Sequence, residues 1–518
     1  MIKDTLYTSE AREHLIAGIR KCAAAVGGTM GTGGANSLIQ ANATPGHLST
    51  NDGVTILDAI RLAHPIEEMG RKILLEAVSR ANKASGDGSS TTCVLTAALL
   101  EEGLKHIGTA SPMTIKRSLE ECMTFIDTKL TEQSREITEN DVASVAAISA
   151  EDAEIGAMIQ DIYQQISKNG IIYWDISKTD KDSYTIGKGI SVEGAGIASP
   201  YMCDREQTSG NFMTAARLTN PQVLITKEKL TSAAVFESLF LTLHNQGKKE
   251  VVVFCDDFEV QVIAQLVTTH QVQGFRTVVI KMPVLWKDLW YEDLAIASGA
   301  TIIDPALGLS IKDAKPEHLG TFTHITADKD TTYIDGIQDV SAHVEALSQN
   351  DDEHSKLRVA RLNIKTARYF VGASSDSALS YRRLKVEDAI ASAYHALNGG
   401  IVAGGGVALL SIALSSEFPA TIGGMILHEA LKAPMKQILT NIGMDMESIV
   451  YKLEGPHDGF DTRTRDVVDM FEAQITDPTV IVRNACKNAI SVAASILTCT
   501  TVVVLPEQES YQPNIPTL

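Results

Sequence analysis

The chain has 518 residues, of which 44% are hydrophobic, 21% charged and only 5% aromatic. A single hydrophobic core stops growing near about 250–300 residues, so this soluble, globular composition predicts two to four domains. The formal net charge is −19. An acidic chain without a Lys/Arg run repels a phosphate backbone, so we expect no nucleic-acid binding.

The cysteines and the apolar segments indicate a cytoplasmic protein. The seven cysteines are scattered and form no C-x-x-C pair, which favours reduced, buried thiols. The first residues are charged and lack the apolar stretch of a signal peptide. Residues 489–505 are short for a membrane span and contain five Ser or Thr. We therefore expect a buried helix that leads into a strand, and no membrane insertion.

The predicted elements divide the chain into two helical ends and a mixed middle. Helical spacing runs from residue 9 to about 130, and again from about 384 to 497. Between them, short β-branched runs alternate with helical stretches at 233–245 and 258–270. The simplest organisation is a helical domain made from both ends, with an α/β domain inserted and two connectors that can act as hinges. The β-branched runs are 171–174, 223–226, 251–255, 277–281 and 301–304.

The segment Gly-Asp-Gly-Ser-Ser-Thr-Thr at 86–92 lies between two predicted amphipathic helices. Its glycines let the backbone approach a ligand closely, and Ser89, Ser90 and Thr91 fall where the second helix should begin. Free N–H groups and hydroxyls at that position can hold phosphate. Asp87 would repel phosphate unless a cation lay between them, which suggests Mg²⁺. An ordinary helix–turn–helix with a serine cap is the structural alternative.

Two more glycine clusters and two carboxylates are candidates for the same site. The clusters are 27–34 and 404–406, and the second precedes an apolar helix predicted from Val407. Asp52 and Asp388 could orient or deprotonate an attacking water, although taken alone each is more simply interpreted as a turn or capping residue. No P-loop and no strand-linked G-x-G-x-x-G is present. The residues alone indicate an unusual phosphate site.

Taken in order, these segments resemble the motifs of group I chaperonins, the GroEL family. The nucleotide loop G-D-G-T-T-T of that family corresponds to 86–91, with two serines in place of threonines. Its K-D-G-V corresponds to 51–54, where Asn51 replaces the lysine. The remaining family motifs also have counterparts here: I-S-A at 148–150, a T-T-x-I-I-D-G-like segment at 331–336, R-V-E-D-A at 385–389 with Lys385 first, V-V-A-G-G-G-V-A-L at 401–409 with Ile401 first, and L-D-P-T at 476–479 with Thr476 first.

The resemblance implies an α+β multidomain fold with three domains. A mostly helical equatorial domain, which binds ATP, would comprise residues 1–133 and 399–518. A small intermediate domain, which acts as the hinge, would comprise 134–188 and 367–398. An α/β apical domain, which binds clients, would be inserted at 189–366.

The resemblance also implies an ATPase site and its cofactors. Asp87 would bind Mg²⁺, Asp388 would orient the attacking water, and Asp52 would assist; a monovalent cation such as K⁺ is left open. Ile475 would pack on the base. The implied ATP-binding residues are Thr29, Met30, Gly31, Asp87, Gly88, Ser89, Ser90, Thr91, Gly405, Ile475 and Asp477.

The implied partners are unfolded or misfolded polypeptides and further copies of the chain. The subunits would form rings of seven, single or doubled, and a co-chaperonin lid is left open. Client chains would bind exposed apolar side chains of the apical domain, although these could instead be ordinary core residues. The implied client-binding residues are Ile197, Tyr201, Met202, Leu241, Ile263 and Val267.

Three functions remain to be compared. The first is an ATP-driven chaperonin that captures unfolded chains and promotes their folding. The second is a chaperonin-like scaffold without turnover, against which the presence of Asp52, Asp87 and Asp388 argues. The third is an unrelated soluble ATP-dependent enzyme, which predicts a charged middle domain with a catalytic pocket.

Overall fold

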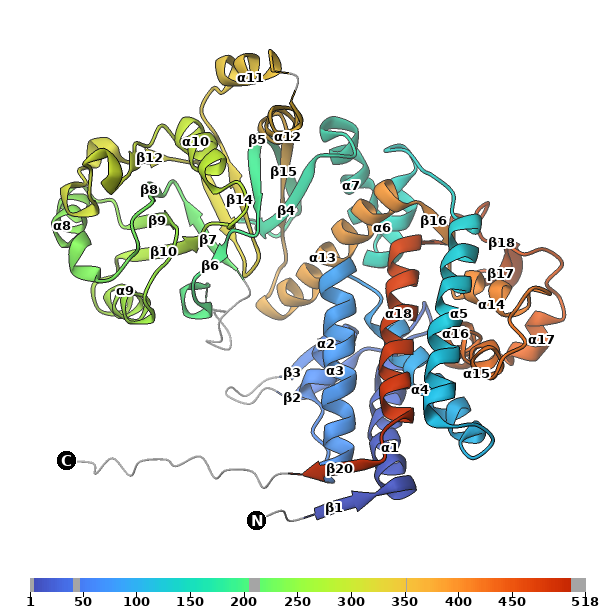
Figure 1. Ribbon diagram of the computed structural model, residues 1–518. Helices are drawn as coiled ribbons and strands as arrows, with labels where there is room; N and C mark the ends of the chain where they lie inside the picture. Colours follow the sequence, from blue (N-terminus) through green and yellow to red (C-terminus); the bar gives the residue numbers. More distant parts are fainter. Residues whose placement is uncertain (1–3, 41–46, 205–214, 351, 505–518) are drawn as a thin grey trace. The chain divides into compact units, whose positions relative to one another are not determined.

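The computed structural model describes residues 4–40, 47–204, 215–350 and 352–504 (Figure 1). The described chain separates into two compact units. One unit is built from both chain ends, up to residue 164 and from residue 373 onward. The other consists of residues 165–372. The expected helical assembly from both ends, with an α/β insertion, is therefore present.

The first unit is a bundle of long helices around one apolar core. Its central helix is α18, which packs against α3, α4 and α5, while α1 packs against α3 and α4. Helix α3 begins with Pro at its first turn and ends at Gly86, which adopts the left-handed conformation that favours glycine. These helices are α1 (Thr8–Gly27), α3 (Pro65–Ser85), α4 (Ser89–His106), α5 (Pro112–Gln133) and α18 (Thr479–Leu497).

Shorter helices and two-stranded ladders complete this unit. The first strand, β1, pairs antiparallel with the last, β20, so the two ends of the described chain lie side by side (Figure 1). The other ladders pair β2 with β3, β16 with β19 and β17 with β18. The helices are α2 (Gly53–Ala59), α6 (Val142–Ala150), α7 (Ala153–Ile166, whose last residues belong to the second unit), α13 (Asp376–Gly399), α14 (Val407–Ala413), α15 (Ile422–Ala430), α16 (Ala433–Asn441) and α17 (Met446–Val450). The strands are β1 (Asp4–Tyr7), β2 (Ser37–Gln40), β3 (His47–Thr50), β16 (Ile401–Ala403), β17 (Asp458–Asp461), β18 (Asp466–Asp469), β19 (Thr476–Pro478) and β20 (Thr501–Val504).

The second unit contains two six-stranded sheets. In the first sheet, the parallel strands β11, β8, β9 and β10 are neighbours in that order, with β6 and β12 paired antiparallel at β10 and β8. The second sheet has the order β4-β15-β5-β14-β13-β7. The strands are β4 (Ile171–Ile176), β5 (Ser183–Glu193), β6 (Gly196–Ile197), β7 (Ala216–Thr219), β8 (Gln222–Thr226), β9 (Glu250–Cys255), β10 (Arg276–Lys281), β11 (Ile302–Ile303), β12 (Gly320–Thr321), β13 (His324–Ala327), β14 (Thr331–Asp335) and β15 (Lys365–Val371).

Helices pack on the first sheet, and their apolar faces create two cores. One core contains Phe236 and Leu239 near α8 together with Val262 and Leu266 of α9. The other contains Trp290 of α10 and side chains of both sheets. The buried strands β8, β9 and β10 read as continuous apolar runs rich in β-branched residues, as parallel strands do when both faces are covered. The helices of this unit are α8 (Glu237–Asn245), α9 (Val260–Gln273), α10 (Lys287–Ser298), α11 (Ser341–Ser348) and α12 (Glu353–Leu362).

The division into three domains stays a prediction. The helices α6 and α13 of the expected intermediate domain belong to the first unit, whereas β4 and β15 belong to the second. The segment 489–504 is a buried helix followed by a strand, as expected. Within the described residues, α18 is the helix whose length and hydropathy reach those of a membrane span, and its apolar side chains mostly line the helical core.

Candidate functional site

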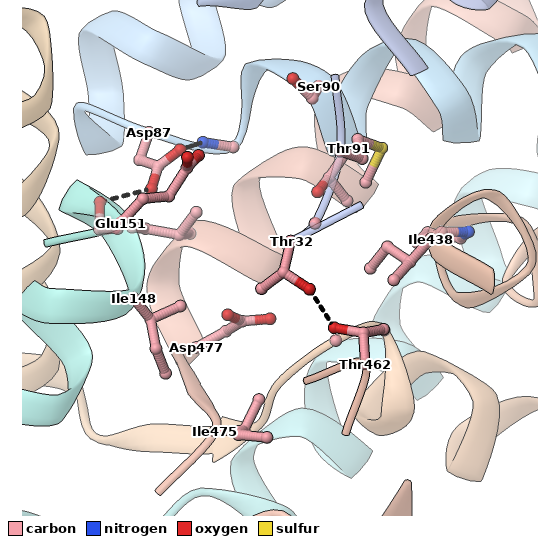
Figure 2. A pocket seen from close by; sticks show the side chains of 18 of the residues that line it. Thr32, Asp87, Ser90, Thr91, Ile148, Glu151, Ile438, Thr462, Ile475 and Asp477 are labelled. Carbon is pink, nitrogen blue, oxygen red and sulfur yellow. Dashed lines mark hydrogen bonds between the residues drawn. The ribbon is translucent and has the colours of Figure 1, made fainter. Parts of the chain in front are cut away.

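A cavity of about 840 Å³ lies in the first unit and is lined by segments from both ends of the chain. All thirteen residues predicted to bind or hydrolyse ATP line it. Figure 2 shows Asp87, Ser90 and Thr91 along one side and Ile475 on the opposite side. Segments far apart in the sequence therefore meet at one pocket, which is lined by both polar and apolar side chains. The thirteen are Thr29, Met30, Gly31, Asp52, Asp87, Gly88, Ser89, Ser90, Thr91, Asp388, Gly405, Ile475 and Asp477.

The loop between α3 and α4 places a helix N-terminus on the cavity. Gly86 ends α3 with φ 69°, and Gly88 precedes α4 with φ 90°. A Cβ on Gly88 would come within 2.8 Å of Ile481 Cγ2, so the position requires glycine for space as well as conformation. Among the described residues no side chain caps α4, so the alternative of a serine-capped turn does not describe this loop. The N–H groups and hydroxyls of residues 89–91 can bind an anion there.

Asp87 is fixed by hydrogen bonds from three segments. Its Oδ1 accepts from the Gly88 backbone at 2.5 Å, and its Oδ2 accepts from the hydroxyls of Ser149 and Ser392 at 3.1 and 3.2 Å. The two serine hydroxyls are also 3.1 Å apart. Ser392 was not among the predicted site residues, although it lies one helical turn after Asp388 on α13, a spacing that could have revealed it.

Burial and mutual repulsion perturb the carboxylates of the cavity. Burial, then the nearby charges of Asp87 and Asp52, raise the pKa of Asp388 well above its ordinary value. Lys385 opposes this shift. Burial, and then the charge of Asp87, raise the pKa of Asp477 to about 7. A cation placed among these carboxylates would favour their ionised forms.

The side chains around the cavity suit a cation that is bound partly by the protein and partly by phosphate. No group of three or more His, Cys, Asp or Glu side chains in the described part of the chain is arranged to hold a metal by itself. Mg²⁺ is commonly held by one or two carboxylates together with substrate phosphates and water. Asp87, beside the uncapped start of α4, has this character.

Asp52 has two roles in the structure. Its carboxylate caps α2, accepting from the Thr55 backbone and hydroxyl at 2.7 and 2.6 Å. The capping alternative is therefore realised, yet Asp52 also lines the cavity. The cap holds its carboxylate in one orientation, which is what a water-positioning group needs.

Glycine loops frame the part of the cavity around Ile475, where apolar side chains lie beside the polar Thr462 and Asp477. Asn441 of α16 donates its amide to the carbonyls of Gly27 and Met30, at 2.8 and 2.9 Å, and so holds the first glycine cluster. The hydroxyls of Thr32 and Thr462 are hydrogen-bonded, as Figure 2 shows. An apolar surface on which a flat ring could pack is supplied by Ile475, Ile148 and Met470.

The model of the TCP-1/cpn60 chaperonin family matches residues 22–506, which include the whole cavity. This chain belongs to that family. The chaperonin is also similar to two crystal structures of the chaperonin gp146 from bacteriophage EL 2 (Pseudomonas aeruginosa) in presence of ATP-BeFx. Crystal form II has a TM-score of 0.69 at 16% identity over 98% of this chain and 100% of that chain. For crystal form I the TM-score is 0.64 at 15% identity, over 97% and 99%. The expected GroEL-like α+β multidomain fold is thereby confirmed.

The client-binding residues expected for this chaperonin divide by exposure. All six belong to the second unit. Tyr201 and Leu241 are 64% and 63% exposed. Ile197 and Val267 are half-buried against the core near α8 and α9. A residue not predicted, Val260 at the start of α9, is 81% exposed, and it shares a helix face with Val267 seven positions on.

Met202 and Ile263 require a correction. Each is only 5% exposed and belongs to the core beneath α8 and α9. The Met202 side chain is directed inward, where its sulfur accepts from the Val279 backbone at 3.4 Å. Ile263 lies with Val262 and Leu266 on the face of α9 turned toward the strands. For these two positions the core alternative describes the structure.

Proposed function

We propose that this chaperonin hydrolyses ATP in the 840 Å³ cavity and uses the cycle to capture and release unfolded polypeptides. The observation that supports it most strongly is the convergence of all thirteen predicted residues on one cavity. A chain without turnover would have no need of Asp52, Asp87 and Asp388 around a phosphate-binding helix start. The proposed chemistry uses positioning and electrostatics, as phosphoryl transfer generally does.

Each side of the cavity has a proposed task. The N–H groups and hydroxyls at the start of α4 bind the phosphates, and Asp87 holds Mg²⁺, which neutralises phosphate charge when bound. Ile475 packs on the base, and Gly405 and Asp477 lie against the nucleoside. Residues 29–31 close the site from the first glycine cluster. K⁺ is a further candidate cation at this site.

Asp388 orients the water that attacks the terminal phosphate, with Asp52 alongside. Both carboxylates line the cavity, and the cap on α2 already fixes Asp52. By holding a cation, Asp87 would offset part of the negative charge that, after burial, raises the pKa of Asp388, and so would favour the ionised, water-orienting form of Asp388.

The larger organisation that we propose follows the family. Residues 1–133 and 399–518 form the equatorial domain, 134–188 and 367–398 the intermediate domain, and 189–366 the apical domain. Copies of the chain form rings of seven in the cytoplasm, and exposed apolar side chains such as Tyr201 and Leu241 bind client chains. A co-chaperonin lid is compatible with this arrangement.

A phosphate-release assay on the purified chain, with and without an unfolded polypeptide, tests the proposal. We expect Mg²⁺-dependent ATP turnover together with suppressed aggregation of the unfolded polypeptide. Assembly without turnover would favour the scaffold. Turnover without any effect on unfolded polypeptide would favour an enzyme with a small-molecule substrate.

A further inference from the structure

The carboxylate of Glu151 joins two segments of the cavity wall. Its Oε1 accepts from the side-chain amide of Asn51 at 2.9 Å and from the ammonium of Lys385 at 2.8 Å. Glu151 ends α6 in the left-handed conformation, with φ 57°. All three residues line the cavity, and Figure 2 shows Glu151 beside Asp87.

The two partners of Glu151 each adjoin a proposed catalytic carboxylate. Asn51 immediately precedes Asp52, and Lys385 lies one helical turn before Asp388 on α13. The hydrogen-bonded chain of Asn51, Glu151 and Lys385 therefore spans from the Asp52 segment to the helix that carries Asp388. Next to it, a second contact joins the end of α6 to α13, because Asp152 pairs with Arg382 at 3.0 Å.

Stability alone is a weak reason for this arrangement. The Glu151 side chain is about half exposed, and exposed ion pairs contribute only about 0–1 kcal/mol. Against that gain, a left-handed backbone at a residue with a side chain is unfavourable and tends to occur at functional sites. Lys385 is buried, so its ammonium is held in a defined place. Asn51, Glu151 and Lys385 therefore form a defined link between the segments that carry Asp52 and Asp388.

We propose that Asn51 is a positioning residue for ATP hydrolysis, acting through Glu151 and Lys385 to set the separation of the Asp52 and Asp388 carboxylates. This inference rests on the proposed function. The Asn51 amide donates, the Glu151 carboxylate accepts and the Lys385 ammonium donates, so no proton changes place. Misplacing catalytic groups by about 1 Å can lower the rate as much as about 10²-fold.

Replacing Asn51 by Ala tests this role in the full-length assembly. The Asn51 carbonyl accepts from the Thr29 hydroxyl at 3.3 Å, a backbone contact that the substitution preserves. We expect kcat to fall about tenfold, with KM for ATP changed less than about twofold. Glu151→Ala should give a similar fall, and the double variant no larger one, because both remove the same link.

Exchanging the hydrogen-bond donor and acceptor between positions 51 and 151 distinguishes a positioning role from a general loss of stability. Asn51→Asp places two carboxylates face to face and should lower kcat at least as much as Asn51→Ala. Adding Glu151→Gln gives the new carboxylate at position 51 a donor and keeps an acceptor for Lys385, so kcat should recover to within about threefold of wild type. Asn140→Ala is the control, because it removes a 3.0 Å bond from Gln164 at an exposed site away from the cavity.

The outcomes are distinguishable. If the wild-type chain hydrolyses ATP, two results would overturn the positioning role and leave the proposed function intact. One is an unchanged kcat in Asn51→Ala. The other is a kcat that does not recover in the double variant Asn51→Asp/Glu151→Gln, when melting curves show that this variant is folded. A wild-type chain without ATP turnover overturns the proposed function and the positioning role together.

Discussion

At the scale of single residues, Asp388 is the sharpest test of the proposed chemistry. Replacing it by Ala removes the water-orienting carboxylate and leaves the phosphate-binding start of α4 unchanged. We expect turnover to fall by about 10²-fold or more while ATP binding persists. Phosphate release and nucleotide titration measure the two effects separately. The control is Asp58→Ala, which changes an exposed residue of α2. If Asp388→Ala hydrolysed ATP at a rate near that of wild type, Asp388 would have no role in the mechanism.

Asp477 predicts a pH-dependent effect on stability. Its pKa is about 7 in the folded chain against an ordinary 3.8, so the folded state holds a proton that the unfolded state releases. The cost to folding is absent below pH 3.8, grows as the pH rises toward the folded pKa of about 7 and then levels off. Asp477→Asn removes this cost and should stabilise the nucleotide-free chain by up to about 4 kcal/mol at about pH 8. Thermal melting at about pH 5 and about pH 8 checks this; a larger gain at the lower pH would contradict it.

At the scale of elements, the segments around α8 and α9 carry exposed side chains that are proposed to capture clients and buried side chains that stabilise the fold. Tyr201 and Leu241 are exposed, so replacing both by Ser should abolish capture of a denatured protein without unfolding the unit. Each exposed apolar side chain that a client covers contributes up to about 1.5–3 kcal/mol. Aggregation suppression at stoichiometric rings measures capture, with Leu357→Ser on α12 as an exposed control. Undiminished suppression would place the client site elsewhere.

A buried residue of α9, Ile263, gives the opposite expectation. Ile263→Ala should lower the free energy of unfolding by about 2–5 kcal/mol, because it leaves a cavity between α9 and the strands. Denaturant titration measures this loss. If the free energy of unfolding of Ile263→Ala equalled that of wild type, the core beneath α9 would be less tightly packed than the burial of Ile263 indicates.

At the scale of the whole molecule, the proposed ring predicts assembly. Cyclic symmetry repeats one heterologous contact until it closes. Mass photometry at micromolar concentration with nucleotide should show a species near seven times the 55.7 kDa of one chain, or twice that mass. A monomer alone under these conditions would count against a chamber.

The cavity was more predictable from the sequence than the client surface. Gly86, Asp87 and Gly88 alone were compatible with an ordinary helix–turn–helix, and it was their resemblance to a family motif, in order with the other motifs, that identified distant partners. Helical spacing shows which residues share a face but does not show which face is covered. Ile263 and Val267 share a face of α9, yet one is buried and the other half-buried.

Contacts between polar side chains far apart in sequence were beyond such reasoning. The carboxylate of Glu151 meets Asn51 and Lys385, which lie 100 and 234 positions away. No local pattern encodes that meeting, because it depends on where α6 ends relative to β3 and α13. Ser392, which binds Asp87, is an exception, because its spacing from Asp388 on α13 could have revealed it.

The position of α18 at the centre of the helical bundle has a consequence for biosynthesis. A ribosome completes residues 165–372 in one run, so the second unit can fold early, as domains generally do during translation. The first unit must wait for α18 and β20, which are translated after its other described elements, and α18 fills the space among α3, α4 and α5. A nascent chain that ends before residue 479 therefore leaves that apolar interior open, and so displays the kind of surface that the finished assembly is proposed to bind.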